Sequence, residues 1–458
     1  MALVIRRKII MSPRNLKLLI IILIAATAIA FGFLYFYNTT DKTGTVGSTA
    51  GTNFLSQIWP FGGTNNELPT ATEPTDISGF EPAPATEAPA AKLRKVSDLS
   101  IAGYIIFQKE RFKELPVIIP VIEPASTDAA GTASQAAVVK PIAPPTEFVP
   151  ALRYAERATG NIYQAFADKL DERKFTTTII PQIHEAFFGN HGDSVIFRYL
   201  KTDGRTIETF AGILPKEVLG ADSANTSLKG IFLPENISDM TISRDTSRMF
   251  YIFSSGTNAV GISAGLAGEK RIQLFDSPFT EWLSEWPNSR MVTLTTKPSA
   301  NVPGYMYGID PNLKDFNKIL GGIPGLTTLT SPSGRLIAYG NRDLTLYLYD
   351  TGTGNTQVLP AKTLPEKCVW GKLSETLYCA VPKFVLNDEY PDAWYRDEIS
   401  FSDSIWKIDV KTGTYTVIAD VYTLAGEDAD GIKLALDEAE KYLFFINKKD
   451  FKLWEIAL

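Results

Sequence analysis

The sequence predicts an all-β fold, a seven-bladed β-propeller that follows a transmembrane helix and a disordered stalk. Three observations support this prediction. A turn motif recurs between residues 189 and 444, about four strand-like apolar runs accompany each copy, and the N-terminal region has a strongly biased composition. A repeat of roughly 40–55 residues with about four strands is typical of propellers. Counting the units gives seven blades, and six or eight also fit the spacing.

Each copy of the turn motif is followed by a polar or basic residue and then by an apolar run. The expected turn centres are His191-Gly192, Asp245-Thr246, Asn288-Ser289, Ser333-Gly334, Leu373-Ser374 and Glu438-Ala439. Runs of alternating or β-branched residues on both sides of such turns indicate β-hairpins. A first, irregular blade is expected to use strands at 101–107, 151–156, 161–166 and 174–180.

The last unit has strands near 431–436, 441–447 and 452–458, and it lacks a fourth strand. Residues 93–98 have the right character to supply this strand, because they precede the first inner strand of the domain. We therefore expect the N-terminal end of the domain, at residues 93–458, to close the ring against its C-terminal end. Such closure removes exposed sheet edges.

The N-terminal region predicts the compartment. An uncharged apolar stretch from Leu18 to Tyr37 is about long enough to cross a bilayer as a helix. Basic residues precede it within residues 1–17, so the positive-inside rule places this tail in the cytoplasm and the rest of the chain outside. The alternative is a signal peptide cleaved after Ala28-Ile29-Ala30, although the apolar run continues beyond that site. In either case we expect the propeller to be extracytoplasmic at the cell membrane.

Residues 38–92 are rich in Thr, Gly, Pro, Ala and Ser, which predicts a disordered stalk. An aromatic island at residues 54–62 interrupts the stalk. It is either a membrane or partner contact or a chance cluster within a linker.

Two insertions interrupt the repeats, at about 108–150 and 383–403. The second is acidic and aromatic, and we expect it to project from one face of the ring. Its candidate binding residues are Tyr390, Asp392, Trp394, Tyr395 and Arg396, since aromatic residues and arginine are enriched at binding hot spots. A solvated insertion without a binding role is the alternative.

Composition excludes several classes of function. A net charge of −6 argues against binding to nucleic acid. With only two histidines and two cysteines, a zinc site built from these ligands is nearly excluded, and we expect no metal or cofactor. No catalytic residues are assigned from the sequence.

Cys368 and Cys379 lie symmetrically about the turn at Leu373-Ser374. A tight hairpin would place them opposite each other, at a separation somewhat long for a disulfide. An oxidising compartment favours the disulfide, and two buried thiols are the alternative.

The fifth unit contains SPSGRLIAYG followed by LYLYDTGTGNTQVL, and the sixth contains CVWGKLSETLYCAVP followed by SIWKIDVKTGTYTVI. These units resemble the WD40-like repeat of TolB-type bacterial envelope propellers. The resemblance implies a module that binds proteins or, in some cases, carbohydrates. Some relatives are accessory domains of serine peptidases.

The leading functional expectation is therefore a recognition or scaffolding module for a protein or surface polymer of the cell envelope. The principal alternative is a carbohydrate-active hydrolase that uses carboxylates at the propeller channel. A subunit of a larger membrane complex is a third possibility. A cluster of acids at the channel would favour the enzyme, whereas an exposed apolar or aromatic patch would favour the binding module.

Overall fold

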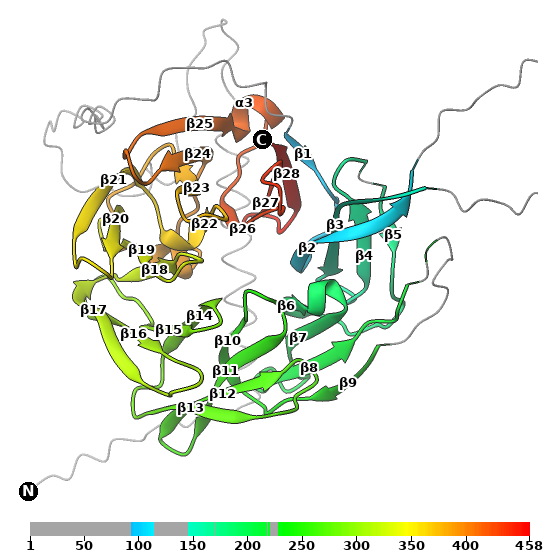
Figure 1. Cartoon of the computed structure of the whole chain (residues 1–458), viewed down its shortest axis with the longest axis horizontal. Helices are drawn as coiled ribbons and strands as arrows, with labels where there is room; N and C mark the ends of the chain where they lie inside the picture. The colour runs from blue at the N-terminus through cyan, green and yellow to red at the C-terminus, as the bar shows by residue number, and fades with distance from the viewer. Residues whose placement is uncertain (1–92, 114–144, 170, 218, 220–227) are drawn as a thin grey trace, which may run out of the picture. The chain divides into compact units, whose positions relative to one another are not determined.

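The computed structural model describes residues 93–113, 145–169, 171–217, 219 and 228–458. These residues form seven antiparallel four-stranded sheets around a common axis, so the prediction of a seven-bladed propeller is confirmed (Figure 1). The expected tail, transmembrane helix and stalk at residues 1–92 lie outside this description. Within it, no helix is long and apolar enough to span a bilayer.

Each of blades 1 to 6 is a meander whose first strand lies nearest the axis and whose fourth lies at the rim (Figure 1). Blade 1 consists of β2 (Ile101–Phe112), β3 (Thr146–Glu156), β4 (Ile162–Phe166) and β5 (Arg173–Lys174). Blade 2 consists of β6 (Ile183–Gly189), β7 (Ser194–Leu200), β8 (Ile207–Ile213) and β9 (Lys229–Phe232). Blade 3 consists of β10 (Ile237–Ile242), β11 (Arg248–Ser255), β12 (Asn258–Gly265) and β13 (Ile272–Ser277). Blade 4 consists of β14 (Trp282–Asn288), β15 (Met291–Thr296), β16 (Pro303–Ile309) and β17 (Phe316–Pro324). Blade 5 consists of β18 (Thr327–Thr330), β19 (Leu336–Gly340), β20 (Thr345–Asp350) and β21 (Thr356–Lys362). Blade 6 consists of β22 (Cys368–Trp370), β23 (Thr376–Pro382), β24 (Asp403–Asp409) and β25 (Tyr415–Asp420). Short helical segments are η2 (Asn190–Gly192), η3 (Pro365–Lys367), α2 (Asp392–Tyr395) and α3 (Val421–Ala425).

Blade 7 closes the ring with strands from both ends of the domain. Its first three strands are β26 (Gly431–Leu436), β27 (Tyr442–Asn447) and β28 (Leu453–Ala457), and its fourth is β1 (Leu93–Lys95). In the register, Leu93 faces Ile456 and Lys95 faces Trp454. The incomplete last repeat therefore receives its missing strand from the start of the domain, as the sequence predicted, and β28 acquires a paired outer edge.

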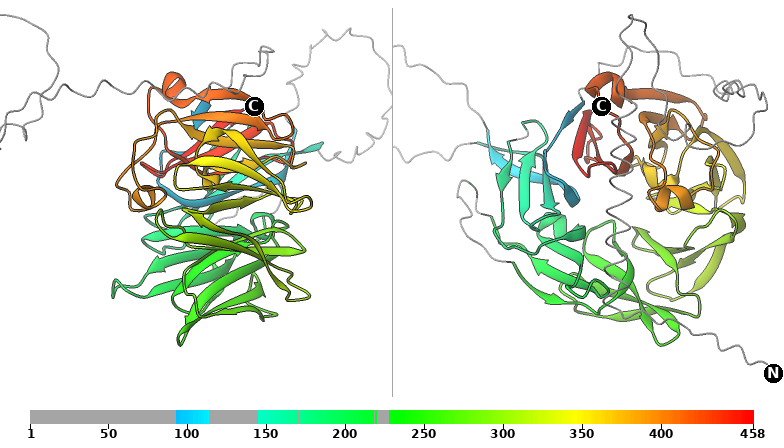
Figure 2. Two further views of the ribbon diagram at one scale, coloured as in Figure 1. Left: turned by 90° about the vertical axis from the view of Figure 1, so that its left-hand side faces the viewer. Right: turned by 180° about the vertical axis from the view of Figure 1, so that it is seen from behind.

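The meander gives the ring two distinct faces. Connections from second to third strands, and from each blade to the next, lie on one face, which we call the insertion face because it carries residues 383–402. Connections from first to second and from third to fourth strands lie on the opposite face, which we call the turn face. Figure 2 (left) shows the insertion on one side of the ring and the tip of the β2–β3 hairpin on the other.

The recurring turns lie on the turn face, but several centres differ by one residue from those expected. The backbone N–H of Gly334 donates to the carbonyl of Ser331, so Pro332-Ser333 forms the centre and Gly334 follows it with a left-handed φ of 74°. Thr246 and Ser374 take the same position with φ of 57° and 62°. The Gly of the cleanest repeat thus marks a position of positive φ, which other blades fill at some conformational cost.

Blade 1 departs from the strands expected for it. Strand β2 runs on to Phe112 and β3 already begins at Thr146, so both ends of the expected 108–150 insertion are paired strands that form a long hairpin. Its fourth strand, β5, contains only two residues instead of the expected 174–180. The pairing of β2 with β3 continues past the edge of the blade. The spacing of the repeats does not reveal this continuation.

Apolar side chains fill the spaces between adjacent blades. Between blades 3 and 4, for example, Phe250, Phe275 and Trp282 are buried together, with the rings of Phe275 and Trp282 5.2 Å apart in an edge-to-face arrangement. Burying one such ring contributes roughly 1.5–3 kcal/mol. The abundance of aromatic residues in the sequence therefore stabilises the contact of one sheet with the next.

Candidate functional site on the insertion face

The blade-six insertion, residues 383–402, is held firmly against the propeller. Its anchors are Tyr390, Trp394 and Phe401. They are buried together with Leu344, from the β19–β20 connection, and Leu364, from the connection between blades 5 and 6. Trp394 is only 4% exposed. Tyr390 and Trp394, two of the residues expected to bind a partner, therefore pack against the protein itself.

A buried ionic network lies directly beneath these rings. The carboxylate of Asp430 accepts hydrogen bonds from Trp394 Nε1 at 2.9 Å and from the backbone N–H of Phe401 at 3.0 Å. The ammonium of Lys367 is fully buried, pairs with Asp430 and donates to Asp403 at 2.8 Å. Burial raises the pKa of Asp403 to about 6, although the charge of Lys367 opposes this shift. Because the network joins the insertion to blade 7, it fixes the base of the insertion.

The other three expected binding residues also make contacts within the chain. Asp392 accepts a hydrogen bond from the backbone N–H of Ala300 at 2.6 Å, which ties the insertion to blade 4. The hydroxyl of Tyr395 donates to Glu366 near the axis. Arg396 is exposed and pairs with Glu398 at 2.9 Å. The insertion thus contacts blades 4 to 7 and has little freedom to move as a loop.

One solvent-exposed stretch of the insertion is apolar. Phe384 is 71% exposed and Leu386 is 64% exposed, with Val385 between them. We call residues 384–386 the apolar tip. Sequence analysis did not identify it, because the aromatic and charged residues that follow it are of the types enriched at binding hot spots. The available signal was the apolar run at residues 384–386, next to an acidic segment.

A second group of functional candidates lies on the inner strands. Asp239 of β10 accepts hydrogen bonds from the backbone N–H and hydroxyl of Ser284 in the next blade, at 2.7 and 2.5 Å. Glu285 of β14 accepts in the same way from the backbone N–H of Thr330, at 2.9 Å. These carboxylates therefore satisfy donors on the open edge of the neighbouring inner strand.

These carboxylates influence one another across the axis. Burial, together with the nearby charge of Glu366, raises the pKa of Glu285 to about 7, and burial with the charge of Asp239 raises that of Glu366 to about 7. Burial raises the pKa of Asp239 to about 6. Asp239 and Glu366 belong to blades 3 and 6, so they interact because both approach the axis.

An ion pair also joins the inner strands of blades 7 and 2, which lie on either side of blade 1. Lys433 of β26 in blade 7 lies 3.7 Å from Glu185 of β6 in blade 2. The axis therefore has a mixed-charge side at blades 7 and 2 and an acidic side at blades 3, 4 and 6. Sequence analysis did not identify these residues. Aligning the repeats would have shown the signal, an apolar–polar–acidic triplet in Ile183-His184-Glu185, Ile237-Ser238-Asp239 and Leu283-Ser284-Glu285.

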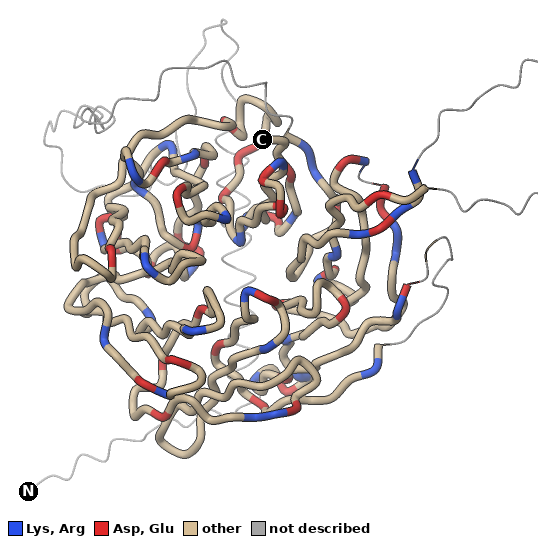
Figure 3. The backbone as a smooth tube through the Cα atoms, viewed as in Figure 1, with Lys and Arg blue, Asp and Glu red and all other residues tan. Residues whose placement is uncertain are grey.

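The acidic groups do not form a metal site. Among the residues that the structure describes, no group of three or more His, Cys, Asp or Glu side chains is placed to hold a metal ion. The described backbone carries basic and acidic residues interspersed around the ring (Figure 3).

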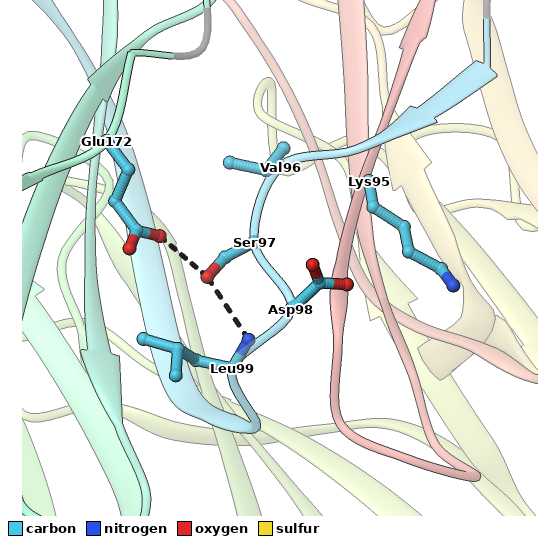
Figure 4. A pocket seen from close by; sticks show the side chains of 6 residues that line it. All are labelled: Lys95, Val96, Ser97, Asp98, Leu99 and Glu172. Atoms are coloured by element: carbon cyan, nitrogen blue, oxygen red, sulfur yellow. Dashed lines mark hydrogen bonds between the residues drawn. The ribbon is translucent and has the colours of Figure 1, made fainter.

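A pocket of about 300 Å³ marks the seam where blade 7 meets blade 1 (Figure 4). It is lined by Lys95, Val96, Ser97, Asp98, Leu99 and Glu172. Ser97 donates to Glu172 at 2.7 Å and accepts from the backbone N–H of Leu99 at 3.2 Å, as Figure 4 shows. Because these polar groups bond to one another, the pocket is best explained as a junction formed by ring closure.

The two cysteines form a disulfide within blade 6. Cys368 and Cys379 face each other in the register of β22 and β23, with Cα atoms 4.0 Å apart and sulfur atoms 2.09 Å apart. The disulfide is buried between blades 5 and 6, at the insertion-face end of β22, and we assign it a structural role.

No protein-family model matches the chain, and no curated protein matches it. Among solved structures it is similar to an oligogalacturonate lyase in complex with manganese, at 11% identity and a TM-score of 0.42, covering 67% of this chain and 85% of that one. It is also similar to TolB from Acinetobacter baumannii, at 11% identity and a TM-score of 0.38, covering 57% and 59% of the two chains. An oligogalacturonate lyase from Vibrio parahaemolyticus matches at 11% identity and a TM-score of 0.44, covering 67% and 86%.

This chain has a β-propeller fold with TolB among its structural neighbours. The propeller fold implied by the resemblance of the fifth and sixth repeats is present in the structure. At such low identity the likeness concerns the fold alone.

Proposed function

We propose that this chain is a membrane-anchored extracytoplasmic recognition module, which binds a protein of the cell envelope through its insertion face. One observation carries the proposal: the apolar tip is exposed on an insertion that is itself anchored in the core. Exposed apolar side chains on a fixed support lose little conformational freedom on binding, which favours recognition.

The polar contacts of the insertion support the same function. The side chain of Asn301 donates to Glu389 at 2.9 Å and Lys448 donates to the carbonyl of Trp394 at 3.0 Å, so blades 4 and 7 hold the insertion from both sides. The tip is thereby presented at a defined place on the face. An apolar surface of this kind suits a protein groove better than a hydrated polymer.

The sequence of residues 1–92 supports the proposed location. The apolar stretch from Leu18 to Tyr37, with basic residues before it, fits a helix that spans the membrane with its N-terminus in the cytoplasm. The chain enters the propeller at Leu93, and the register of β1 places this residue at the turn-face end of blade 7. The insertion face is thus the one opposite the entry point of the stalk.

Affinity capture with the full chain, solubilised from membranes, tests the proposal. We expect Phe384→Ser with Leu386→Ser to reduce recovery of the captured envelope protein at least tenfold, because both apolar contacts are lost. Leu373→Ser is the matched control, since Leu373 is 76% exposed on the turn face of the same blade. Equal recovery with the tip variant and the wild type would disprove recognition through this surface.

A carbohydrate-active hydrolase is the second candidate, and the axis carboxyl groups favour it. A carboxyl group that holds its proton near neutral pH can act as a general acid, and Glu285 and Glu366 have raised pKa values. Release of reducing ends from an envelope polysaccharide should then be abolished by Glu366→Gln and retained in Glu398→Gln. Absence of activity in the wild type, across the polysaccharides of the host envelope, would argue against this candidate.

A further inference from the structure

A cluster of basic residues on the turn face, at the junction of blades 1 and 2, surrounds one carboxylate. Lys109 of β2, Arg153 of β3 and Arg173 of β5 all direct their cationic groups at Glu217. Gln164 of β4 also donates to Glu217, at 3.5 Å. We call these four donors the basic cradle. Glu217 itself follows the end of β8 and belongs to no strand.

The cradle is organised by contacts that do not depend on Glu217. The guanidinium of Arg153 lies 4.3 Å from the ring centroid of Phe175 and 4.9 Å from that of Phe107. It also donates to Gln164 at 3.0 Å and to the carbonyl of Gly192 at 2.6 Å. Stacked rings and fixed acceptors hold an arginine in a defined orientation. We therefore expect Arg153 to keep its position when Glu217 is removed.

The cationic groups are also close enough to repel one another. Burial and the charges of Arg153 and Arg173 lower the pKa of Lys109 to about 8. Asp193 pairs with Arg153 at 2.9 Å but is 65% exposed, so it neutralises the cluster only in part. A carboxylate at the position of Glu217 relieves this repulsion, and an anion with more than one carboxylate would relieve it further.

We propose that the basic cradle is a binding site for a small di- or tricarboxylate, with Glu217 as its internal occupant. The ligand displaces the Glu217 side chain and takes over its contacts with Lys109, Arg153 and Arg173. Arg173, with 37% of its side chain exposed, lies on the open side of the cradle. The site is independent of the proposed recognition function, because it lies on the opposite face.

Calorimetric titration of the full chain with citrate tests this proposal. We expect Glu217→Gln to bind citrate at least tenfold more tightly than the wild type, because the internal competitor loses its charge. Adding Arg173→Gln to that variant should abolish the gain, whereas Arg205→Gln, a change in an exposed turn of blade 2, should leave it intact. The neutral triester of citrate should not bind to any variant.

A second measurement keeps the proposal testable if Glu217→Gln folds poorly. In the wild type, saturating citrate should slow acylation of Lys109 at pH 8 at least threefold, measured by mass spectrometry, with Lys297 as the exposed reference. Unchanged acylation of Lys109, or equal citrate affinity of the wild type and Glu217→Gln, would overturn the proposal and leave the cluster as an ion-paired junction between two blades.

Discussion

At the scale of single residues, Asp side chains organise the turns that follow the third strands. The carboxylate of Asp350 accepts hydrogen bonds from the backbone N–H groups of Gly352 and Thr353, and Asp409 does the same for Lys411 and Thr412. Asp310 repeats this arrangement in blade 4. An Asp at this position therefore stabilises its own turn.

Glu285 gives a residue-scale prediction about pH. The pKa of Glu285 in the folded protein is about 7, well above the usual value for Glu. Its protonated form therefore stabilises the folded state at low pH, and this stabilisation is lost as the pH rises towards 7. Glu285→Gln should therefore raise the free energy of unfolding at pH 8 by roughly 1–2 kcal/mol relative to the wild type, and change it little at pH 4.5. Urea unfolding at both pH values measures this difference.

Glu281→Gln, a change at an exposed position near the same strand, provides the control. It should leave the pH dependence of unfolding as in the wild type. A pH profile of Glu285→Gln that parallels the wild type would show that Glu285 is ionised at little cost in the native state.

At the scale of elements, the blade-six insertion combines a buried base with an exposed tip. Its helix α2 is too short to be stable alone, so packing of Tyr390, Trp394 and Phe401 has to hold it. Trp394 also donates a hydrogen bond to the carboxylate of Asp430 beneath the rings, so this position needs a hydrogen-bond donor as well as an apolar ring. The insertion is therefore a structural extension of blades 5 to 7 that carries a separate surface feature.

Trp394→Ala should release the insertion from the propeller. Loss of a buried Trp costs about 3–5 kcal/mol locally, because a cavity remains and Asp430 loses a donor. We expect limited proteolysis to cut within residues 383–402 at least tenfold faster than in the wild type. Leu386→Ala should not change the rate of cleavage, since Leu386 lies at the exposed tip. Equal cleavage of both variants would contradict the assigned anchor.

The hairpin of β22 and β23 gives a second prediction at this scale. Replacing both Cys368 and Cys379 by Ala should lower the free energy of unfolding by about 2–3 kcal/mol, because the disulfide closes a short loop in the unfolded chain. Chemical denaturation with and without reductant measures the effect in the wild type. Reductant should have no effect on the double variant.

At the scale of the whole molecule, ring closure depends on a three-residue strand. The guanidinium of Arg94 in β1 pairs with Glu455 of β28 at 2.6 Å, and the Glu455 side chain is almost fully buried. Burial raises the pKa of Glu455 to about 7, against the opposing effect of Arg94. The closure strand thus brings the partner that lets this carboxylate ionise within the sheet.

Arg94→Ala should therefore weaken the closed ring. We expect a loss of roughly 1–3 kcal/mol in the free energy of unfolding at pH 8, where Glu455 would be charged without its partner. At pH 5, Glu455 is protonated and the loss should be smaller. Lys95→Ala is the control, because Lys95 pairs with the exposed Glu427 and should contribute less than about 1 kcal/mol. A loss independent of pH would show that Glu455 does not carry the effect.

Much of the architecture was accessible from the repeats alone. Strand runs, turn residues and an incomplete last unit predicted seven blades closed by residues near Leu93, since these features depend on local conformation and on the need to pair every edge. The extension of β2 to Phe112 was missed, because pairing beyond the blade depends on the partner strand. For the candidate site, the insertion lies between β23 and β24 as expected, the burial of Tyr390 and Trp394 was not foreseen, and the binding role of the insertion stays a prediction.

The amino-acid sequence by itself determined the strand periodicity, the turn chemistry and the facing positions of Cys368 and Cys379, because each of these depends on neighbours in the chain or in one hairpin. Only the tertiary structure decided that Trp394 is buried while Phe384 is exposed, and that Asp239 and Glu366 share the axis. Burial and long-range charge interactions depend on which blades meet, and the separation of two residues along the chain carries no information about that.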